Sequence, residues 1–422
     1  MNKHTQEMQI GSIRFLYIVT EGFPPTVFDS QVVDYLRMME SQGIVFELVV
    51  FERLLAIFPN WRRNLRRLHE VRAQLNGRIH FRFLITTFLG WDFWVPQQQL
   101  YWIAKPPDQF VRTVIHARTQ TSAAIALRLK HWIPKTRVVF DMRGDTPAEY
   151  LLHVEKSGGD IRSGSVQKKH EKLKRIERQV VKDSDAILCV SEVMRDKIVG
   201  EYLVPSQKIH VIPTVANTRK FSWNPQLRNA VRKELGIEDK FAFVYAGSIR
   251  AYQSLKLLLD FFRKVQEHRP EVHLLLITPQ RTEAEQSLYR SLSPDTYTIR
   301  SASHDEMARW LNAADAGLLL REFNAVNQVA APTKFAEYLL CGLPVVMTKG
   351  IGDFSELAKQ EALGIVLEGS HWEEELHARW NELDSLTDFI QRERIAQKGK
   401  QMFSNERFAE YILPVYSTQS EG

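Results

Sequence analysis

The stretch from Ala313 to Gly352 constrains the fold more than any other part of the chain. Its first segment, AADAGLLLR, has the apolar run of a buried strand and ends at Arg321. The segment PTKFAEYLL reads as a helix, because Pro332 suits the first helical position and Gly342 is the residue type preferred after a helix end. The segment LPVVM reads as a second buried strand. A strand, a helix and a strand in this order predict an α/β fold with a doubly wound parallel sheet.

The start of this helix carries the residues of an anion site. Such folds bind ligands at the carboxyl ends of their strands, where the helix presents the N–H groups around Thr333, Lys334 and Phe335. Lys334 and Arg321 add positive charge. Glu337 lies one turn further on and would accept hydrogen bonds from the two hydroxyls of a ribose. The alternative is an ordinary buried strand–helix–strand unit with a surface lysine and glutamate.

The same residues carry a family resemblance. PTKFAEYLLCGLPVV, preceded by ADAGLLLR and followed by GIGD, resembles the donor-binding segment of glycosyltransferase family 4, the retaining group 1 enzymes with the GT-B fold. The resemblance implies two Rossmann-like doubly wound domains that face each other across a cleft. It also implies that Glu337 holds the ribose of a nucleotide-sugar and that the helix start holds its diphosphate. The donor would be a substrate, a UDP- or GDP-sugar, and no cofactor is expected.

The chain departs from the family pattern at three places. Position 329, where many relatives have a glutamate that contacts the donor sugar, is Val329. No lysine stands where a Lys-Gly pair is expected after Arg250. The segment FDMRGD lacks the histidine found there in many relatives, so Asp141 or Arg143 would cover its role. These departures leave the donor sugar open and keep a nucleotide-sugar-binding protein without transferase activity as the alternative.

The catalytic candidates lie in both halves of the chain. His116 matches the histidine at the end of an "IHAH"-like strand of the family, and a structural histidine is the alternative. With Asp141 and Arg143 it would line the first domain, while Arg321 and Lys334 would stabilise the departing nucleoside diphosphate. No DxD-like pair follows a strand near the donor site, so no metal is expected.

Two further loops supply binding candidates. In the loop after the strand IRFLYIVT, Gly22, Phe28, Asp29 and Gln31 are candidates for acceptor or diphosphate contacts, with a plain two-proline turn as the alternative. In the second half, the strand FAFVYAG is followed by a loop that could hold a phosphate. The candidate phosphate-binding residues of this loop are Gly247, Ser248 and Arg250.

Length and composition fit two soluble domains. We expect an amino-terminal acceptor-binding domain over residues 1–217 and a nucleotide-sugar-binding domain over 218–405. Residues 406–422 would form a helix that crosses back to the first domain. Two cysteines and a polar start without an apolar leader favour a cytoplasmic protein.

Charge is distributed unevenly along the chain. Residues 1–217 contain 31 Lys+Arg and 22 Asp+Glu, a net +9, whereas the remainder carries −3. The helix beginning near Asn60 places Trp61 and Leu65 on an apolar face among arginines, which is typical of contact with an anionic membrane from the cytoplasmic side or of a packed helix with a solvated face. Residues 156–182, a flexible loop and then a charged helix, could receive an anionic acceptor. We expect a glycan or lipid-linked acceptor from surface polysaccharide or glycolipid synthesis, and no nucleic acid, because no aromatic residues alternate with the arginines on the basic face between Arg62 and Arg72.

Overall fold

A computed structural model describes residues 12–21, 28–53, 61–86, 93–94, 97–104, 111–212, 214–249 and 255–417. The chain forms two compact units. Unit 1 comprises Met1–Val190, Arg195–Ile212 and Ala409–Gly422, and unit 2 comprises Ser191–Met194 and Pro213–Phe408. The sequence placed the boundary at residue 217, whereas the chain leaves unit 1 at Ile212. Unit 1 is therefore assembled from three separate segments of the chain.

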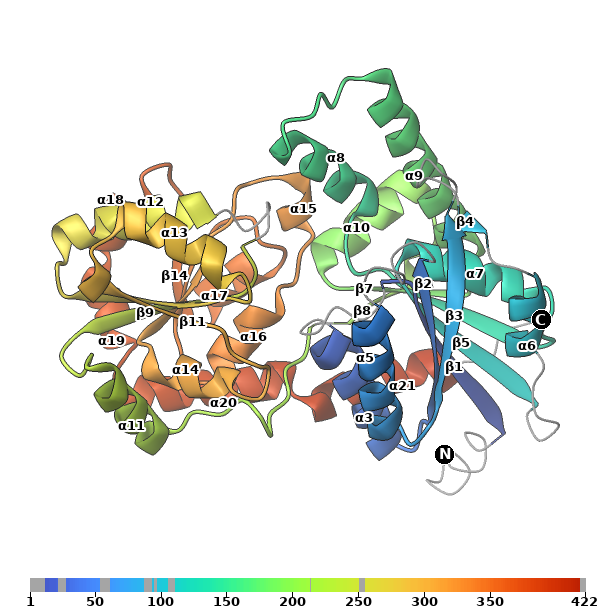
Figure 1. Ribbon diagram of the computed structural model, residues 1–422, viewed down its shortest axis with the longest axis horizontal. Helices are drawn as coiled ribbons and strands as arrows, with labels where there is room; N and C mark the ends of the chain where they lie inside the picture. Colours follow the sequence, from blue (N-terminus) through green and yellow to red (C-terminus); the bar gives the residue numbers. More distant parts are fainter. Residues whose placement is uncertain are drawn as a thin grey trace. The chain divides into compact units, whose positions relative to one another are not determined.

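Unit 1 is built on an eight-stranded sheet with the order β4-β3-β2-β1-β5-β6-β7-β8 (Figure 1). The pairs are parallel except for β3 with β4, which is antiparallel. Its strands are β1 (Ile13–Val19), β2 (Phe46–Arg53), β3 (Ile79–Thr86), β4 (Phe93–Trp94), β5 (Arg112–Arg118), β6 (Thr136–Asp141), β7 (Ala186–Cys189) and β8 (Ile209–Val211). Its helices are η1 (Asp29–Val33), α3 (Asp34–Ser41), α5 (Trp61–Gln74), α6 (Gln97–Ala104), α7 (Gln120–Lys130), α8 (Thr146–Lys156), α9 (Gly164–Asp183), α10 (Glu192–Tyr202) and the returning α21 (Asn405–Ser417).

Unit 2 is built on a six-stranded parallel sheet with the order β11-β10-β9-β12-β13-β14. Its strands are β9 (Phe241–Ala246), β10 (Val272–Ile277), β11 (Tyr297–Arg300), β12 (Ala316–Leu319), β13 (Val345–Thr348) and β14 (Gly364–Leu367). Its helices are α11 (Pro225–Leu235), α12 (Leu255–His268), α13 (Arg281–Ser291), α14 (Met307–Ala313), α15 (Ala325–Gln328), α16 (Thr333–Leu340), α17 (Phe354–Gln360), α18 (Trp372–Ala378), α19 (Trp380–Ser385) and α20 (Phe389–Phe403). The two Rossmann-like domains expected from the sequence are confirmed.

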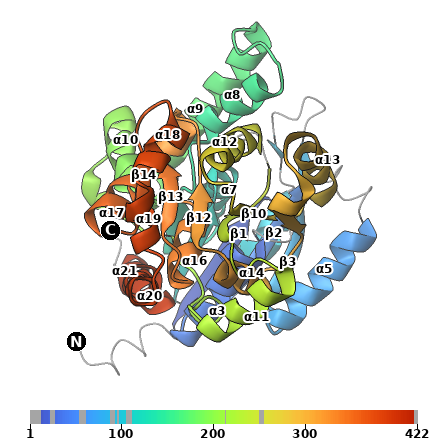
Figure 2. The same cartoon turned by 90° about the vertical axis from the view of Figure 1, so that its left-hand side faces the viewer.

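Alternation along the strands of unit 2 divides its core into two layers. Ala242, Val244 and Ala246 of β9 pack with residues of α11, α14, α16 and α20. Phe243 and Tyr245 point the opposite way and pack with residues of α12, α13 and α18. Figure 2 shows α12, α13 and α18 above this sheet and α11, α14 and α16 below it. Helices therefore cover both faces, as a parallel sheet requires.

Each sheet has one point at which the direction of winding reverses. In unit 1, the chain moves outward from β1 to β2 and β3 on one side and from β5 to β8 on the other. In unit 2, the same reversal lies between β9 and β12. Ligands of open α/β sheets bind at the carboxyl ends of the strands beside such a point. The topology therefore directs attention to the residues that follow β1 and β5 in unit 1 and β9 and β12 in unit 2.

Several predicted elements differ in detail from those observed. The strand expected over residues 313–321 is the shorter β12, because Ala313 ends α14. The loop expected before Pro332 contains the short helix α15, which Asn324 caps by accepting a hydrogen bond from the Asn327 N–H. The turn expected around Phe28 to Gln31 is helical, and it leads directly into α3.

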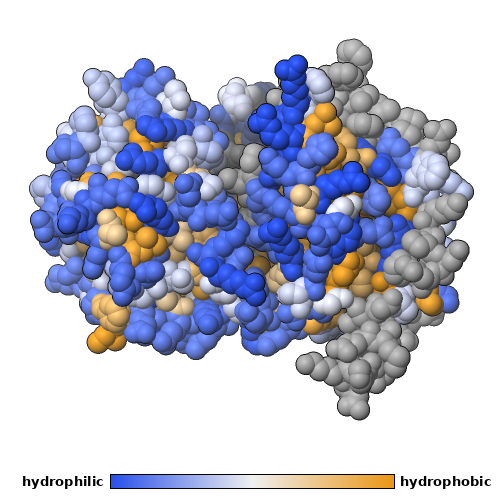
Figure 3. All heavy atoms as spheres, turned by 60° about the horizontal axis from the view of Figure 1, so that its bottom comes forward, coloured by the Kyte–Doolittle hydropathy of each residue, from blue (hydrophilic) through white to orange (hydrophobic). Residues whose placement is uncertain are grey.

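Helix α5 is only half covered by the rest of unit 1. Val71 is buried, whereas Trp61 is 51% exposed and Leu65 45% exposed. The apolar face of the helix is therefore exposed to solvent near its start. Among the described residues, no helix is long and apolar enough to cross a membrane. The face drawn in Figure 3 is mainly hydrophilic, with separate hydrophobic areas between the polar residues.

Candidate active site

The carboxyl ends of β9 and β12 meet in unit 2. Gly247 and Ser248 follow β9 and are half-buried. The Gly247 N–H donates to Ile277 O at 2.9 Å, and the Tyr245 hydroxyl donates to Ser248 O at 2.7 Å, so this turn is fixed on the sheet. Arg250, the third candidate in this loop, lies outside the described residues.

Helix α16 begins beside this edge of the sheet. Pro332 has extended backbone angles, and the helix starts at Thr333. The Phe335 N–H donates to Pro332 O at 3.1 Å, so it is not available to an anion as the sequence suggested. The Phe335 side chain is fully buried and stacks on Phe354 with 4.5 Å between ring centroids. The N–H groups of Thr333 and Lys334, in the first turn of the helix, remain as candidates.

The carboxylate of Glu337 already has a cationic partner. Glu337 is 3% exposed, and the Lys334 ammonium lies 2.5 Å from its Oε2. This i,i+3 ion pair neutralises the buried carboxylate without a ligand. It also places both predicted donor-binding side chains on the first turns of α16.

Arg321 is held by Thr348 of β13 and by Asn327 of α15. Its backbone N–H and carbonyl both bond the Thr348 hydroxyl, at 2.9 and 2.7 Å. Its guanidinium donates to Asn327 Oδ1 at 3.1 Å, and the Asn327 amide donates to Glu322 O at 2.9 Å. Arg321 is 9% exposed, and through Asn327 it supports the loop after β12.

The position of the missing family glutamate is part of the packed core. Val329 is 3% exposed, and its carbonyl accepts a hydrogen bond from the Ser191 hydroxyl at 3.0 Å. This position therefore supplies no carboxylate, because its residue is valine.

Tyr338 ties α16 to the sheet. Its hydroxyl accepts a hydrogen bond from the Ala246 N–H at 3.0 Å, at the end of β9. Its ring lies directly on Gly317 of β12, where a Cβ atom would overlap it. Gly342, at φ 68°, ends the helix, and a Cβ there would lie 2.7 Å from Arg392 O. These contacts set the angle at which the α16 N-terminus meets the strand ends.

A second polar cluster lies at the carboxyl ends of β5 and β6 in unit 1. His116 is 1% exposed and stacks on Tyr17 with 4.4 Å between ring centroids. Its Nδ1 lies 2.6 Å from the Tyr416 hydroxyl, and its Nε2 lies 3.2 Å from Asp141 Oδ2. Both ring nitrogens are therefore occupied, and His116 holds Asp141 instead of facing a ligand.

The ionisation of Asp141 fixes the direction of these hydrogen bonds. Burial opposes ionisation of Asp141, but Arg143 and the bond to His116 lower its pKa to about 2. A carboxylate only accepts, so His116 donates from Nε2, and burial lowers the pKa of His116 so that the ring is neutral. Its Nδ1 then accepts from the Tyr416 hydroxyl, which in turn accepts from Tyr35.

Arg143 and Arg118 both lie near this carboxylate. Arg143 Nη1 is 3.7 Å from Asp141 Oδ1, and Arg118 Nη1 is 3.9 Å from Oδ2. The Arg143 side chain is 22% exposed, whereas that of Arg118 is 5% exposed. Of the predicted catalytic residues in unit 1, Arg143 is thus the one presented toward solvent.

The candidates after β1 differ in their surroundings. Phe28 is 2% exposed and belongs to the core, so it cannot contact an acceptor. Asp29 forms an ion pair with Arg67 of α5. Gln31 accepts a hydrogen bond from Arg118 Nη2 at 2.5 Å, which brings it to the Asp141 cluster. Gly22 lies outside the described residues.

Sequence reasoning gave no specific role to four residues that organise these sites. Arg118 joins Gln31, Glu21 and Asp141, and Tyr416 joins α21 to His116. Asn327 and Tyr338 support Arg321 and α16. Gly317 was the one local signal for the Tyr338 contact, because a glycine inside a strand marks a close approach by another group.

The described residues contain no group of three or more His, Cys, Asp or Glu side chains arranged to hold a metal ion. The cationic and N–H groups of unit 2 and the Asp141 cluster of unit 1 are the polar features at the two winding-reversal points. In unit 2 this feature is a helix start with candidate anion-binding groups, and in unit 1 it is a buried charged network.

Comparison with known proteins relates the chain to one family. Residues 34–214 match the family described as "Glycosyl transferase 4-like domain", and residues 228–402 match "Glycosyl transferases group 1". The D-inositol 3-phosphate glycosyltransferase of Segniliparus rotundus is 27% identical over 272 residues, which are 60% of this chain and 57% of that protein. Across three curated relatives that it matches, the chain spans between 43% and 57% of their length.

Solved structures share the fold. HepE of Anabaena, in complex with UDP and glucose, superposes with a TM-score of 0.67 at 14% identity and covers 96% of this chain and 99% of its own. WaaG, a glycosyltransferase involved in lipopolysaccharide biosynthesis, gives a TM-score of 0.61 at 15% identity over 97% of this chain and 100% of its own. From the two consecutive family matches and this shared architecture, the chain belongs to the group 1, family 4-like glycosyltransferases of the GT-B fold.

Proposed function

We propose that this protein transfers a sugar from a nucleotide-sugar, a UDP- or GDP-sugar, to a glycan or lipid-linked acceptor, with retention of configuration and without a metal. The observation that carries the proposal is the start of α16. Lys334 and Glu337 form an ion pair there at 2.5 Å, beside the N–H groups of the first helical turn and the carboxyl ends of β9 and β12. A helix N-terminus with a lysine suits a diphosphate, and a buried carboxylate suits two ribose hydroxyls.

Donor binding would exchange this internal ion pair for contacts with the nucleotide. The Lys334 ammonium would turn to the diphosphate, and Glu337 would accept the ribose hydroxyls in place of the ammonium. Because Lys334 is on a flexible stem and its side chain is 22% exposed, it can move without unfolding the helix. The exchange keeps the Glu337 carboxylate hydrogen-bonded in both states.

The proposed reaction depends on electrostatic stabilisation. As the bond between the anomeric carbon and the diphosphate oxygen breaks, negative charge grows on the leaving diphosphate, where Lys334 and the α16 N–H groups would stabilise it. The acceptor oxygen bonds the anomeric carbon on the same face, and the leaving phosphate oxygen takes the acceptor's proton. The side chain of Val329 has no nucleophilic atom, so no covalent intermediate can form at that position. Arg143, presented by the Asp141 cluster, is the proposed contact in unit 1.

We also propose a role in surface polysaccharide or glycolipid synthesis, in the cytoplasm and in contact with the membrane surface. Two observations support the role and the membrane contact. The solved structure of WaaG, which shares the fold, is described as a lipopolysaccharide enzyme. Helix α5 presents Trp61 and Leu65 beside exposed Arg62, Arg63 and Arg66, a combination typical of helices that lie on anionic membranes.

A thermal-shift screen tests donor binding. The protein is heated with UDP, GDP, ADP and their sugar conjugates, and the screen is repeated on Glu337→Ala and Lys334→Ala. Ligand at about 100 times its Kd should add about 2.7 kcal/mol of stability, which is visible as a rise in Tm. Glu356→Ala is the matched control, because Lys359 and Glu356 form an i,i+3 pair on the exposed surface of the same unit. A shift with one nucleotide that both site variants lose, and the control keeps, supports the proposal.

Binding without turnover is the second candidate function, and the buried Val329 favours it. Release of free nucleotide and sugar, or of a glycosylated product, from a donor that passes the screen would exclude it. A protein that binds a nucleotide tightly but turns over no donor with any acceptor would be a binding protein. No shift with any nucleotide would overturn the assignment of α16.

A further inference from the structure

Helix α9 carries a concentration of positive charge outside the sites described above. Between Gln167 and Arg178 it has six lysines and arginines and two glutamates. Five described cationic residues of this helix line a surface hollow of about 540 Å³: Lys168, Lys172, Lys174, Arg175 and Arg178. Glu171 is the one carboxylate among the described residues that line it.

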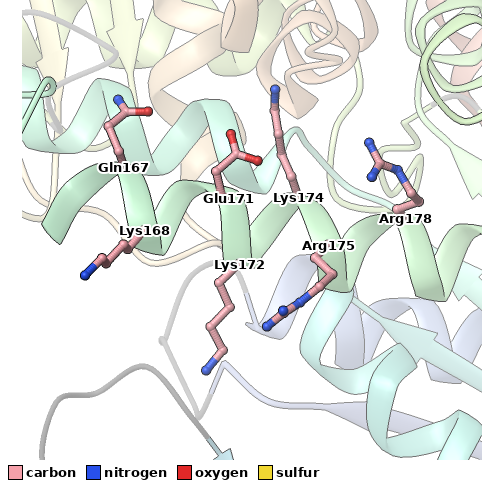
Figure 4. A pocket seen from close by; sticks show the side chains of 7 residues that line it. All are labelled: Gln167, Lys168, Glu171, Lys172, Lys174, Arg175 and Arg178. Atoms are coloured by element: carbon pink, nitrogen blue, oxygen red, sulfur yellow. The ribbon is translucent and has the colours of Figure 1, made fainter. Parts of the chain in front are cut away.

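The spacing places these side chains in two adjacent rows. Lys168, Lys172 and Arg175 follow intervals of four and three residues, so they share one face of the helix. Lys174 and Arg178 follow the same rule one row away, next to Glu171. Figure 4 shows the first row pointing to one side of α9 and the second row pointing to the other side of the helix.

Most of this charge has no internal partner. Among the described residues, no carboxylate forms an ion pair with Lys168, Lys174, Arg175 or Arg178, whereas Lys130 and Lys398 elsewhere pair with Asp185 and Glu361. Like charges at i and i+4 destabilise a helix. The arrangement therefore works against the stability of α9 itself, and an external anion would relieve the repulsion.

The opposite side of α9 is anchored. Glu177 is 2% exposed and accepts a hydrogen bond from the Tyr202 hydroxyl at 2.6 Å. The Gln120 amide donates to the Leu173 carbonyl at 2.5 Å. The basic rows are thus presented by a helix whose own position is fixed within unit 1.

The composition of this surface separates an anionic glycan from other anionic partners. None of the large hydrophobic residues that are exposed in the described chain lies on α9, so it lacks the apolar anchors of a helix that enters a bilayer. It also lacks exposed aromatic rings on which the bases of single strands would stack. From Lys168 to Arg178 the helix rises about 15 Å, which gives room for more than one anionic group.

We propose that the basic rows of α9 bind the acceptor and that this acceptor is an acidic glycan, with carboxylate or phosphate groups. That the bound glycan is the acceptor rests on the proposed function. That it is an anion rests on the residues of α9 alone. Lys168 and Arg175 head the predicted contacts because both are exposed and without carboxylate partners. The net charge of +9 over residues 1–217 is of the same sign and would draw such a glycan toward unit 1.

The test measures binding of four probes to the whole protein: polygalacturonate for carboxylates, polyphosphate for phosphates, neutral dextran, and phosphatidylglycerol vesicles. The double variant Lys168→Glu, Arg175→Glu is compared with Arg290→Glu, Lys400→Glu, which changes net charge equally on exposed sites of unit 2. We expect the α9 variant to weaken polyanion binding by about tenfold, and the control by much less. The probe that binds more tightly identifies the anionic group.

Two results would overturn the proposal. One is equal weakening by the α9 variant and the control, because binding would then follow net charge alone. The other is α9-dependent binding of the vesicles without α9-dependent binding of either soluble polyanion, which would make α9 a membrane contact. Nucleotide-induced shifts in Tm of the same variants report on unit 2 separately, so a failure of donor binding is distinguished from a failure at α9.

Discussion

The Tyr416 hydroxyl lies 2.6 Å from His116 Nδ1, although the two residues are 300 positions apart. The bond closes a directed series in which Tyr35 donates to Tyr416, Tyr416 to His116, and His116 to Asp141. Tyr416, His116 and Asp141 are buried, and Tyr35 is half-buried. The last helix of the chain thereby helps to set the position of a carboxylate at the end of β6, and Asp141 in turn lies between Arg118 and Arg143.

Tyr416→Phe tests this series. Removing one hydroxyl leaves the buried His116 Nδ1 without its donor, so the free energy of unfolding should fall by about 1–3 kcal/mol. Urea unfolding measures the change, and Tyr289→Phe is the control because Tyr289 is 76% exposed. Equal stability of the two variants would mean that the Tyr416 hydroxyl contributes nothing.

The buried carboxyl of Glu177 should make stability depend on pH. Burial raises its pKa to about 7, against the opposing hydrogen bond from Tyr202, and its Oε2 has no partner. The unfolded chain loses this proton near pH 4.5 and the folded chain near pH 7, so stability falls across that interval and is constant above it. Glu177→Gln should therefore gain about 3 kcal/mol relative to the wild type between pH 4.5 and pH 8.

Chemical unfolding at a series of pH values checks this prediction. Glu201→Gln serves as the control, since the Glu201 side chain is 46% exposed. Parallel pH profiles of the wild type and Glu177→Gln would show that Glu177 titrates normally.

The Lys334–Glu337 pair should be coupled in a double-mutant cycle. Lys334→Met leaves a carboxylate that is 3% exposed without its cation, so we expect a loss of about 2–3 kcal/mol. Glu337→Gln in the same chain should restore part of this loss, because the uncompensated charge is gone. The exposed pair Lys359–Glu356 should give a coupling energy of only about 0.3–0.5 kcal/mol. Additive effects at positions 334 and 337 would contradict a buried ion pair.

Gly317 should not tolerate a side chain. A methyl group there would overlap the Tyr338 ring, so Gly317→Ala should destabilise unit 2 by about 1–3 kcal/mol and disturb α16. Gly200→Ala is the contrasting case, because nothing lies near its Cβ position within α10, and it should stabilise by up to about 1 kcal/mol. Thermal unfolding of both variants measures the difference.

Helix α5 should determine any membrane contact. Trp61→Ala with Leu65→Ala removes the exposed apolar residues, and Arg62→Glu with Arg63→Glu reverses the adjacent charge. We expect both pairs of changes to lower sedimentation with phosphatidylglycerol vesicles, at about 1 kcal/mol for each charge near the surface. Binding that is the same with and without anionic lipid would contradict the electrostatic part of this prediction.

The sequence predicted three of the buried strands of unit 2 and the segment of its candidate site, because those features are local. Each buried strand is a contiguous apolar run, and Arg321, Lys334 and Glu337 lie within 17 positions of one another. The Phe335 N–H was misassigned because its bond to Pro332 is a detail of the first helical turn. Helix α15 was missed because it depends on contacts of Asn327 with Arg321 and Glu322.

Unit 1 was less predictable because its cluster is assembled from distant residues. Tyr17, Tyr35, His116 and Asp141 lie on different elements, and no periodicity connects them to Tyr416. Phe28 stands in a segment with two prolines, so its composition suggested a turn, yet its ring is buried in the core. Long-range packing, which a single sequence does not display, decided both outcomes.

The return of α21 to unit 1 has a consequence for synthesis. A ribosome completes the strands of unit 1 long before it produces Tyr416, so until then Phe15 and Phe46 lack the ring that packs against them. The apolar surface around these two rings therefore stays exposed in the nascent chain while unit 2 is translated and begins to fold. Unit 1 is thus the first unit to be synthesised and the last to complete its core. A stop codon just before Tyr416 would leave that core without the Tyr416 ring.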